Sequence, residues 1–133
     1  MVKKLLADIE AADGLVFCAP EFNHSIPGVL KNAIDCASRP YGDSAWAGKP
    51  VALMSASISL FGGVRAQYHL RQCFVFLNMD DVKQPEVAIP TAGQRFDAQG
   101  NLTDDTTKKL IAQLLQALVE KARAAKRPMR QAA

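Results

Sequence analysis

The chain has 133 residues, of which 49% are hydrophobic and 22% charged, a composition that suits one globular domain. No apolar run approaches the ~18 residues of a membrane-spanning helix, and the first residues resemble neither a secretory signal nor a transit peptide, which predicts a cytoplasmic protein. Much of the net charge of +3 lies near the C-terminus without interleaved aromatic residues, so nucleic acid is not an expected partner. A membrane is not an expected partner either, because the chain lacks a long apolar run.

The first 40 residues predict a helix, a strand and a second helix. Apolar residues at helical spacing predict an amphipathic helix at about residues 1–12, with Gly14 as its C-terminal glycine. Residues 15–19 form a continuous apolar run, typical of a parallel strand buried on both faces. Ser25 as a capping residue and Pro27 in the first turn mark the start of the second helix.

The rest of the chain continues this alternation. Residues 51–54 predict a second strand, a glycine pair precedes a third helix, and residues 85–89 predict a short third strand. A loop at 90–101 leads to the last helix, which opens with acidic residues as the helix dipole prefers. Its apolar positions are Leu110, Ile111, Leu114, Leu115, Leu118, Val119 and Ala122.

The order α-β-α-β-α-β-α predicts an α/β fold: a three-layer parallel sheet of about three strands, wrapped by four helices through right-handed crossovers. We expect a single domain over residues 1–124 and a basic C-terminal tail at 125–133. The three cysteines lie in apolar patterns without a CxxC pair, which predicts buried free thiols. His24 and His69 lack a carboxylate or cysteine at ligand spacing, so no metal site is expected.

Two loops, at residues 20–25 and 55–63, leave the carboxyl ends of consecutive predicted strands. In a parallel sheet these ends share one rim, where ligands bind. The second loop is rich in small residues, which let a backbone approach a planar ligand closely. This pattern indicates a ligand-binding rim, although two ordinary strand-to-helix turns would produce it as well.

The sequence PEFNHSIPGVLKNAID at residues 20–35 resembles the flavin-loop motif of the NADPH-dependent FMN reductase family, which includes chromate and quinone reductases. GKPVA at 48–52 and GGVRAQYHLRQ at 62–72 are similar to the family's next strand and helix. The resemblance covers about residues 12–89. It implies a flavodoxin-like fold, FMN at the strand ends, and electron transfer from NADPH or NADH to quinones, flavins or similar acceptors, usually in a homodimer or tetramer.

The resemblance also implies which residues contact the cofactor. Residues of the first loop would face the isoalloxazine ring, mostly through backbone groups, and residues of the second loop would line its other side. The first group is Pro20, Glu21, Phe22 and Asn23, and the second is Ser57, Gly62 and Gly63. No side chain is given a catalytic role, because the flavin performs the redox chemistry. The candidate subunit contacts are Arg65, Tyr68 and Glu86.

The chain departs from the family pattern in several places. Phe22 replaces the usual Tyr, Cys36 replaces a Trp, and Ser55 replaces a Gly. The family's first strand, phosphate-binding loop, first helix and second strand have no counterpart in these 133 residues. We therefore expect an N-terminally truncated sheet with an unpaired edge at residues 15–19. The alternative hypothesis is a non-catalytic, truncated flavodoxin-like module that acts through protein–protein association.

Overall fold

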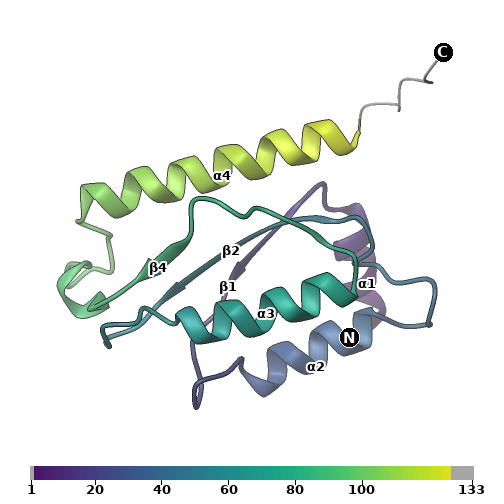
Figure 1. Cartoon of the computed structure of the whole chain (residues 1–133), viewed down its shortest axis with the longest axis horizontal. Coiled ribbons are helices and arrows are strands. Elements are labelled where there is room, and N and C mark those ends of the chain that lie inside the picture. The colour runs from purple at the N-terminus through teal and green to yellow at the C-terminus, as the bar shows by residue number, and fades with distance from the viewer. Residues whose placement is uncertain (1, 127–133) are drawn as a thin grey trace.

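The computed structural model describes residues 2–126, which form an open sheet with helices on both faces (Figure 1). The predicted alternation of helices and parallel strands is confirmed. The elements are α1 (Val2–Ala11), β1 (Leu15–Cys18), α2 (Gly28–Ala37), β2 (Pro50–Ala56), α3 (Val64–Phe76), β3 (Asp80–Asp81), β4 (Val87–Ile89), the 3₁₀ helix η1 (Ala92–Gln94) and α4 (Asp105–Ala125).

β2 is the centre of the sheet, because each of the other described strands pairs with it in parallel. β1 lies along one edge of β2, with Leu15 opposite Val51 and Cys18 opposite Met54. Both β3 and β4 lie along the other edge, β3 beside the start of β2 and β4 beside its end. They are two pieces of one interrupted strand, of which the sequence predicted only the second. Among the described residues β1 pairs with β2 alone, as expected of an unpaired edge.

An ion cluster occupies the interruption between β3 and β4. The buried carboxylate of Asp81 contacts the guanidinium of Arg71, from α3, and the ammonium of Lys83. Burial raises the pKa of the Asp81 carboxyl, but the hydrogen bonds and charges of Lys83 and Arg71 outweigh it and hold that pKa below its ordinary value. The cluster joins α3 to the edge of the sheet where ladder hydrogen bonds are interrupted.

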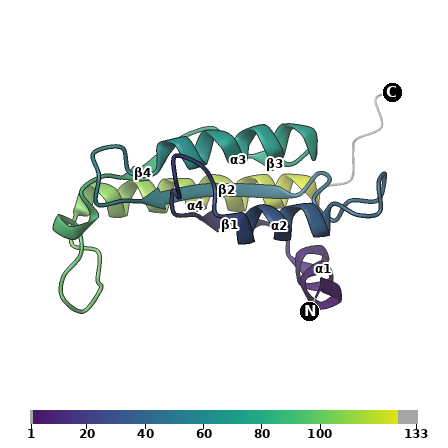
Figure 2. The same ribbon diagram turned by 90° about the horizontal axis from the view of Figure 1, so that it is seen from below.

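The sheet separates two hydrophobic cores. On one face, α1, α2 and α3 cover a core in which the Phe17 ring centroid lies 5.0 Å from that of Phe74 and 6.0 Å from that of Trp46. On the other face, α4 packs over β2 and β4 and buries Leu114 and Leu118. Figure 1 shows α4 on one side of the sheet and α2 and α3 on the other, and Figure 2 shows α1 beside the end of α2.

The prediction that residues 15–19 are buried on both faces is wrong. Phe17 is buried beneath the helices, but Val16 and Cys18 point to the α4 face and are exposed. The reason is that α4 covers β2 and β4 and leaves β1 open. The three cysteines of the described chain are free thiols, but they are not buried as predicted, because Cys36 and Cys73 are only half-buried.

Two predicted helix ends have other causes. Gly14 does not have the positive φ of a C-terminal glycine. It allows a close approach instead, since a Cβ there would lie 3.2 Å from Cδ1 of Leu118 and 3.3 Å from the carbonyl oxygen of Pro50. α2 begins at Gly28 without a side-chain capping bond, so the prediction that Ser25 caps it is wrong.

α4 begins as predicted, because the carboxylate of Asp104 accepts a hydrogen bond of 2.9 Å from the backbone N–H of Thr107. The helix continues to Ala125. Residues 127–133 of the expected basic tail lie outside the described part of the chain, as does Met1. Among the described helices, none combines the length and the apolar character needed to cross a membrane.

Leu114 anchors α4 to the sheet, and its neighbour Leu115 provides a matched control. Leu114 is 0% exposed and Leu115 is 38% exposed. Leu114→Ala should lower the free energy of unfolding by about 2–5 kcal/mol, because it leaves a cavity in the second core. Leu115→Ala should lower it by less than about 1 kcal/mol. Urea denaturation followed by far-UV circular dichroism measures both, and equal losses would contradict this packing.

The Asp81 cluster predicts a pH-dependent contribution to stability. Because the folded-state pKa is lowered, the contribution is present above the ordinary carboxyl pKa of about 3.9 and is lost as the pH falls through the folded pKa. Asp81→Asn should lower the Tm at pH 7. The difference in Tm between this variant and the original chain should become smaller below about pH 4.

Differential scanning fluorimetry between pH 7 and pH 2.5 follows this difference in Tm. Asp8→Asn is the control, because Asp8 forms an exposed ion pair with Lys4 on α1 and should change the Tm little at any pH. A Tm difference for Asp81→Asn that stays constant over the whole range would contradict the prediction.

Candidate functional site

The carboxyl ends of β1, β2 and β4 meet at one rim of the sheet, because the three strands are parallel and in register (Figure 1). Three loops leave this rim, at residues 19–27, 57–63 and 90–104. The first two lead into α2 and α3, and the third carries η1 before α4. All seven predicted cofactor-contacting residues lie in the first two loops.

The first loop is a tight hairpin. Phe22 and Ser25 exchange two backbone hydrogen bonds of 2.9 Å each. Between them, Asn23 and His24 have φ values of 50° and 62°. Two successive positive φ values are typical of a type I′ turn, and Asn and His tolerate this conformation better than most residues. The turn presents the ring of Phe22, which is 59% exposed, at the rim.

Glu21 joins the hairpin to the start of α3. Its carboxylate accepts a hydrogen bond of 3.1 Å from the backbone N–H of Arg65 and another of 3.2 Å from the Arg65 guanidinium. The N-cap of α3 is Gly63, which has no capping side chain, so Glu21 supplies the acceptor and the negative charge that a helix start favours. The guanidinium also lies 4.4 Å from the ring centroid of Phe61.

The second loop returns to α3 through Gly62 and Gly63, whose φ values are 60° and 84°. A Cβ on Gly62 would lie 2.8 Å from the carbonyl carbon of Ala88, and a Cβ on Gly63 would lie 2.9 Å from the side chain of Ser55. Only glycine permits both the conformation and the approach. The two glycines therefore let the start of α3 lie directly against β2 and β4.

A buried hydrogen-bond network holds this approach in place. The hydroxyl of Ser55 donates to the carbonyl of Gly62 at 2.6 Å and accepts from the side-chain amide of Gln67 at 2.7 Å. The same amide nitrogen donates to the carbonyl of Val87 at 2.8 Å. Gln67 is not among the predicted site residues. The signal for it is a polar residue at a position where the helical period places the apolar, inner face of α3.

Ser57 joins the second loop to the third. Its backbone N–H donates to the carbonyl of Ile89 at 3.0 Å, and its carbonyl accepts from the N–H of Ala92 at 2.9 Å. Its hydroxyl bonds to the hydroxyl of Ser59 at 3.1 Å within the same loop. The predicted loop at 90–101 thus contains η1 and contributes directly to the rim.

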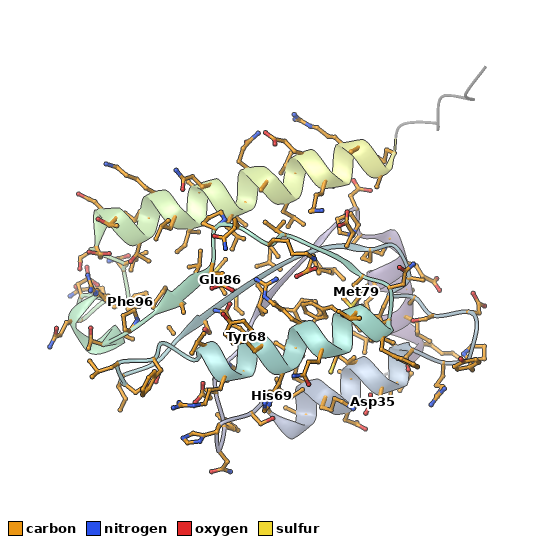
Figure 3. The ribbon with its side chains drawn as sticks, viewed as in Figure 1. Asp35, Tyr68, His69, Met79, Glu86 and Phe96 are labelled. Carbon is orange, nitrogen blue, oxygen red and sulfur yellow. The ribbon has the colours of Figure 1, made fainter. Side chains whose placement is uncertain are left out.

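Large apolar side chains project from the first two loops. Besides Phe22, Ile58 is 86% exposed, Leu60 79% and Phe61 56%. Beside the rim, on the α4 face of the sheet, lies a hollow of ≈ 510 Å³ that is lined by Pro20 among other residues. Exposed apolar side chains and hollows are each typical of surfaces that bind a ligand or a partner. Phe96 of the third loop contributes to the lining (Figure 3).

The three candidate subunit contacts do not form one cluster within the described chain. Arg65 is engaged by Glu21 and Phe61. Tyr68 on α3 is 51% exposed, and Glu86 is exposed in the segment between β3 and β4 (Figure 3). Of the three, only Tyr68 and Glu86 have side chains that are largely exposed.

His24 and His69 are the candidate histidine ligands of a metal. Among residues 2–126, no group of three His, Cys, Asp or Glu side chains is placed to hold a metal ion. His69 lies on α3, and its Nδ1 is 2.8 Å from the hydroxyl of Ser25. Ser25 and His69 are 44 positions apart, so no local sequence pattern predicts their contact.

The matches of this chain to a family model and to known proteins agree with one another. Residues 1–94 match the model of the NADPH-dependent FMN reductase family. An NAD(P)H-dependent FMN reductase of Pseudomonas aeruginosa is 53% identical over 117 residues, which are 88% of this chain and 63% of that protein. A quinone reductase of Pseudomonas putida is 45% identical over 119 residues, which are 90% of this chain and 61% of that protein.

A solved structure gives the same result. FerB, a flavoenzyme NAD(P)H:(acceptor) oxidoreductase from Paracoccus denitrificans, is 34% identical to this chain and superposes with a TM-score of 0.83, covering 93% of this chain and 68% of FerB. The chain spans about three fifths of the length of the two bacterial reductases. The predicted flavodoxin-like fold is confirmed, and the chain belongs to the NADPH-dependent FMN reductase family.

Proposed function

We propose that this chain forms the flavin-ring side of an FMN-dependent oxidoreductase, which passes two electrons from NADPH or NADH to a quinone, flavin or similar acceptor. The observation that carries the proposal is the rim itself, where the hairpin of the first loop and the Gly62–Gly63 turn meet the same helix, α3. The names of the relatives, an FMN reductase and a quinone reductase, support it. A reaction that draws on NADPH or NADH fits the cytoplasmic location that we also propose.

The residues at the rim fit a planar, aromatic group. Bound FMN would supply the redox chemistry. The exposed ring of Phe22 offers an aromatic face, and the backbone of Pro20, Glu21 and Asn23 would contact the edge of the flavin ring. The glycine turn brings the second loop close to the ends of β2 and β4, and Ser57 of that loop would line the other side of the ring. The chain thereby binds and orients the ring.

The same rim does not suit a phosphate. A helix start is the usual binding site for a phosphate group, because its N–H groups and dipole favour an anion. At α3 that place is taken by the carboxylate of Glu21, which accepts from the Arg65 N–H. A phosphate at this helix would face a negative charge. We infer that the described residues recognise the ring of FMN and leave its phosphate to other groups.

This inference yields a test with two flavins. FMN and riboflavin, which lacks the phosphate, should bind the 133-residue chain with similar dissociation constants. Both constants should be larger than about 1 μM, which corresponds to a binding free energy of about −8 kcal/mol. Quenching of flavin fluorescence on titration measures both constants. If neither flavin is quenched at millimolar concentrations, the proposed function is wrong and the non-catalytic alternative is favoured. A sub-micromolar constant for FMN alone would show that these residues do hold the phosphate.

Two exposed phenylalanines sharpen the test. Phe22 is 59% exposed at the rim, and Phe76 is 77% exposed at the opposite end of α3. Phe22→Ala should weaken binding of both flavins roughly 2- to 10-fold, the usual contribution of an aromatic contact. Phe76→Ala should leave both constants unchanged. Equal effects of the two variants would place the flavin away from the hairpin.

We also propose that the chain acts as a homodimer or tetramer. Two surfaces support this: the exposed side chains of Tyr68 and Glu86, and the open edge of β1 beside Val16 and Cys18. Burying a few hundred Å² of such surface at ~25 cal/mol per Å² contributes several kcal/mol to association. Unpaired strand edges also favour pairing with another chain.

Sedimentation velocity over a hundredfold concentration range tests this association. The original chain should shift toward larger species as its concentration rises, and Glu86→Arg should shift it back toward the monomer. Glu120→Arg is the control, because Glu120 is an exposed glutamate on α4 that belongs to neither of the two proposed contact surfaces. A monomer peak that does not change with concentration would refute the proposal.

A further inference from the structure

The hairpin of the first loop makes a second side-chain contact with α3. The hydroxyl of Ser25 lies 2.8 Å from Nδ1 of His69. His69 is on the side of α3 that faces α2, where it lines a groove together with Lys31 and Asp35 of α2 (Figure 3). The contact belongs neither to the predicted cofactor residues nor to the predicted subunit contacts.

The two contacts from the hairpin lie one helical turn apart on α3. Glu21 bonds to Arg65, and Ser25 bonds to His69, four residues further along the helix. Residues four apart lie on the same side of a helix, one above the other. Both ends of the hairpin are therefore held by one side of α3, and Phe22 and the turn project from between them.

α3 is a firm support for the hairpin. Its inner face buries Ala66, Leu70 and Phe74, each at most 1% exposed, against the sheet. Gln67 binds β4 and Ser55 from the same face. Because the first loop is bonded to α3 at two points, α3 also fixes where that loop lies at the rim.

Such support adds to the stability of the turn. Asn23 and His24 both have positive φ, which is unfavourable for residues with a Cβ, and such conformations persist where surrounding contacts determine them. The cross-turn bonds between Phe22 and Ser25 depend on the place of the Ser25 backbone. A contact that fixes the Ser25 side chain therefore acts directly on the turn.

We propose that Ser25 and His69 form a latch that positions the hairpin for the flavin ring, with His69 as a positioning residue. The bond does not depend on the charge of the imidazole. In a neutral ring either Oγ–H donates to Nδ1 or Nδ1–H donates to Oγ, and in a protonated ring Nδ1–H donates. The ligand in this inference rests on the proposed function, but the latch is a property of the chain without ligand.

Hydrogen exchange of the ligand-free chain tests the latch. The backbone N–H groups of Phe22 and Ser25 make the cross-turn bonds, so their exchange reports on the turn. Ser25→Ala and His69→Ala should each speed this exchange roughly 2- to 10-fold, the effect of losing one hydrogen bond. The double variant should exchange no faster than either single variant.

Two further variants separate positioning from general loss of structure. His69→Asn should restore slow exchange, because the Asn amide nitrogen can occupy the place of Nδ1. Gln72→Ala is the matched control, since Gln72 is exposed on α3 in the same groove and should change nothing. The urea midpoint of Ser25→Ala and His69→Ala should fall by no more than the loss of one hydrogen bond accounts for, and that of Gln72→Ala should stay at that of the original chain. Unchanged exchange in both single variants, or additive effects in the double variant, would overturn the latch.

The flavin titration completes the test. Ser25→Ala and His69→Ala should each weaken FMN binding, because the hairpin is then open in a larger share of the molecules and only the positioned hairpin binds the ring, and His69→Asn should retain it. Faster exchange with unchanged FMN binding would overturn the positioning role and leave the proposed function intact. Absence of FMN binding in the original chain would refute the proposed function together with that role, while the exchange measurement would still decide whether the latch exists.

Discussion

The close approach of the Gly62–Gly63 backbone to β2 and β4 is the constraint on which the rest of the rim depends. A Cβ at Gly62 would lie 2.8 Å from the backbone of β4, so the turn admits no larger residue. The approach sets the place where α3 begins. That place in turn puts Arg65 and His69 beside the first loop, where Glu21 and Ser25 bind them.

The two faces of the sheet differ in how completely the helices cover them. The face under α1, α2 and α3 holds the aromatic cluster of Phe17, Trp46 and Phe74, and α3 on this face supports the hairpin. The other face is covered by α4 only over β2 and β4. The packed core holds α3 against the sheet, while the part of the other face beside β1 that α4 does not cover adjoins the hollow.

Much of this fold follows from local sequence. The alternation of apolar runs and helical periods predicts the helices and main strands, and the motif at residues 20–35 predicts the rim and the family. What it does not predict depends on partners distant in the chain. Local sequence predicts that Ser25 caps a helix, but its hydroxyl bonds to His69, 44 residues away. β3 has two residues, too few for a period, and the exposure of Val16 follows from where α4 packs.

The interrupted strand makes the two edges of the sheet different. On the β3–β4 side, the paired segments have two and three residues, an ion cluster separates them, and Pro85 lacks an N–H to offer. Such an edge is a poor template for another strand. β1 offers four continuous residues and no such obstacle. β1 is therefore the edge of the described sheet that is better suited to pair with another strand.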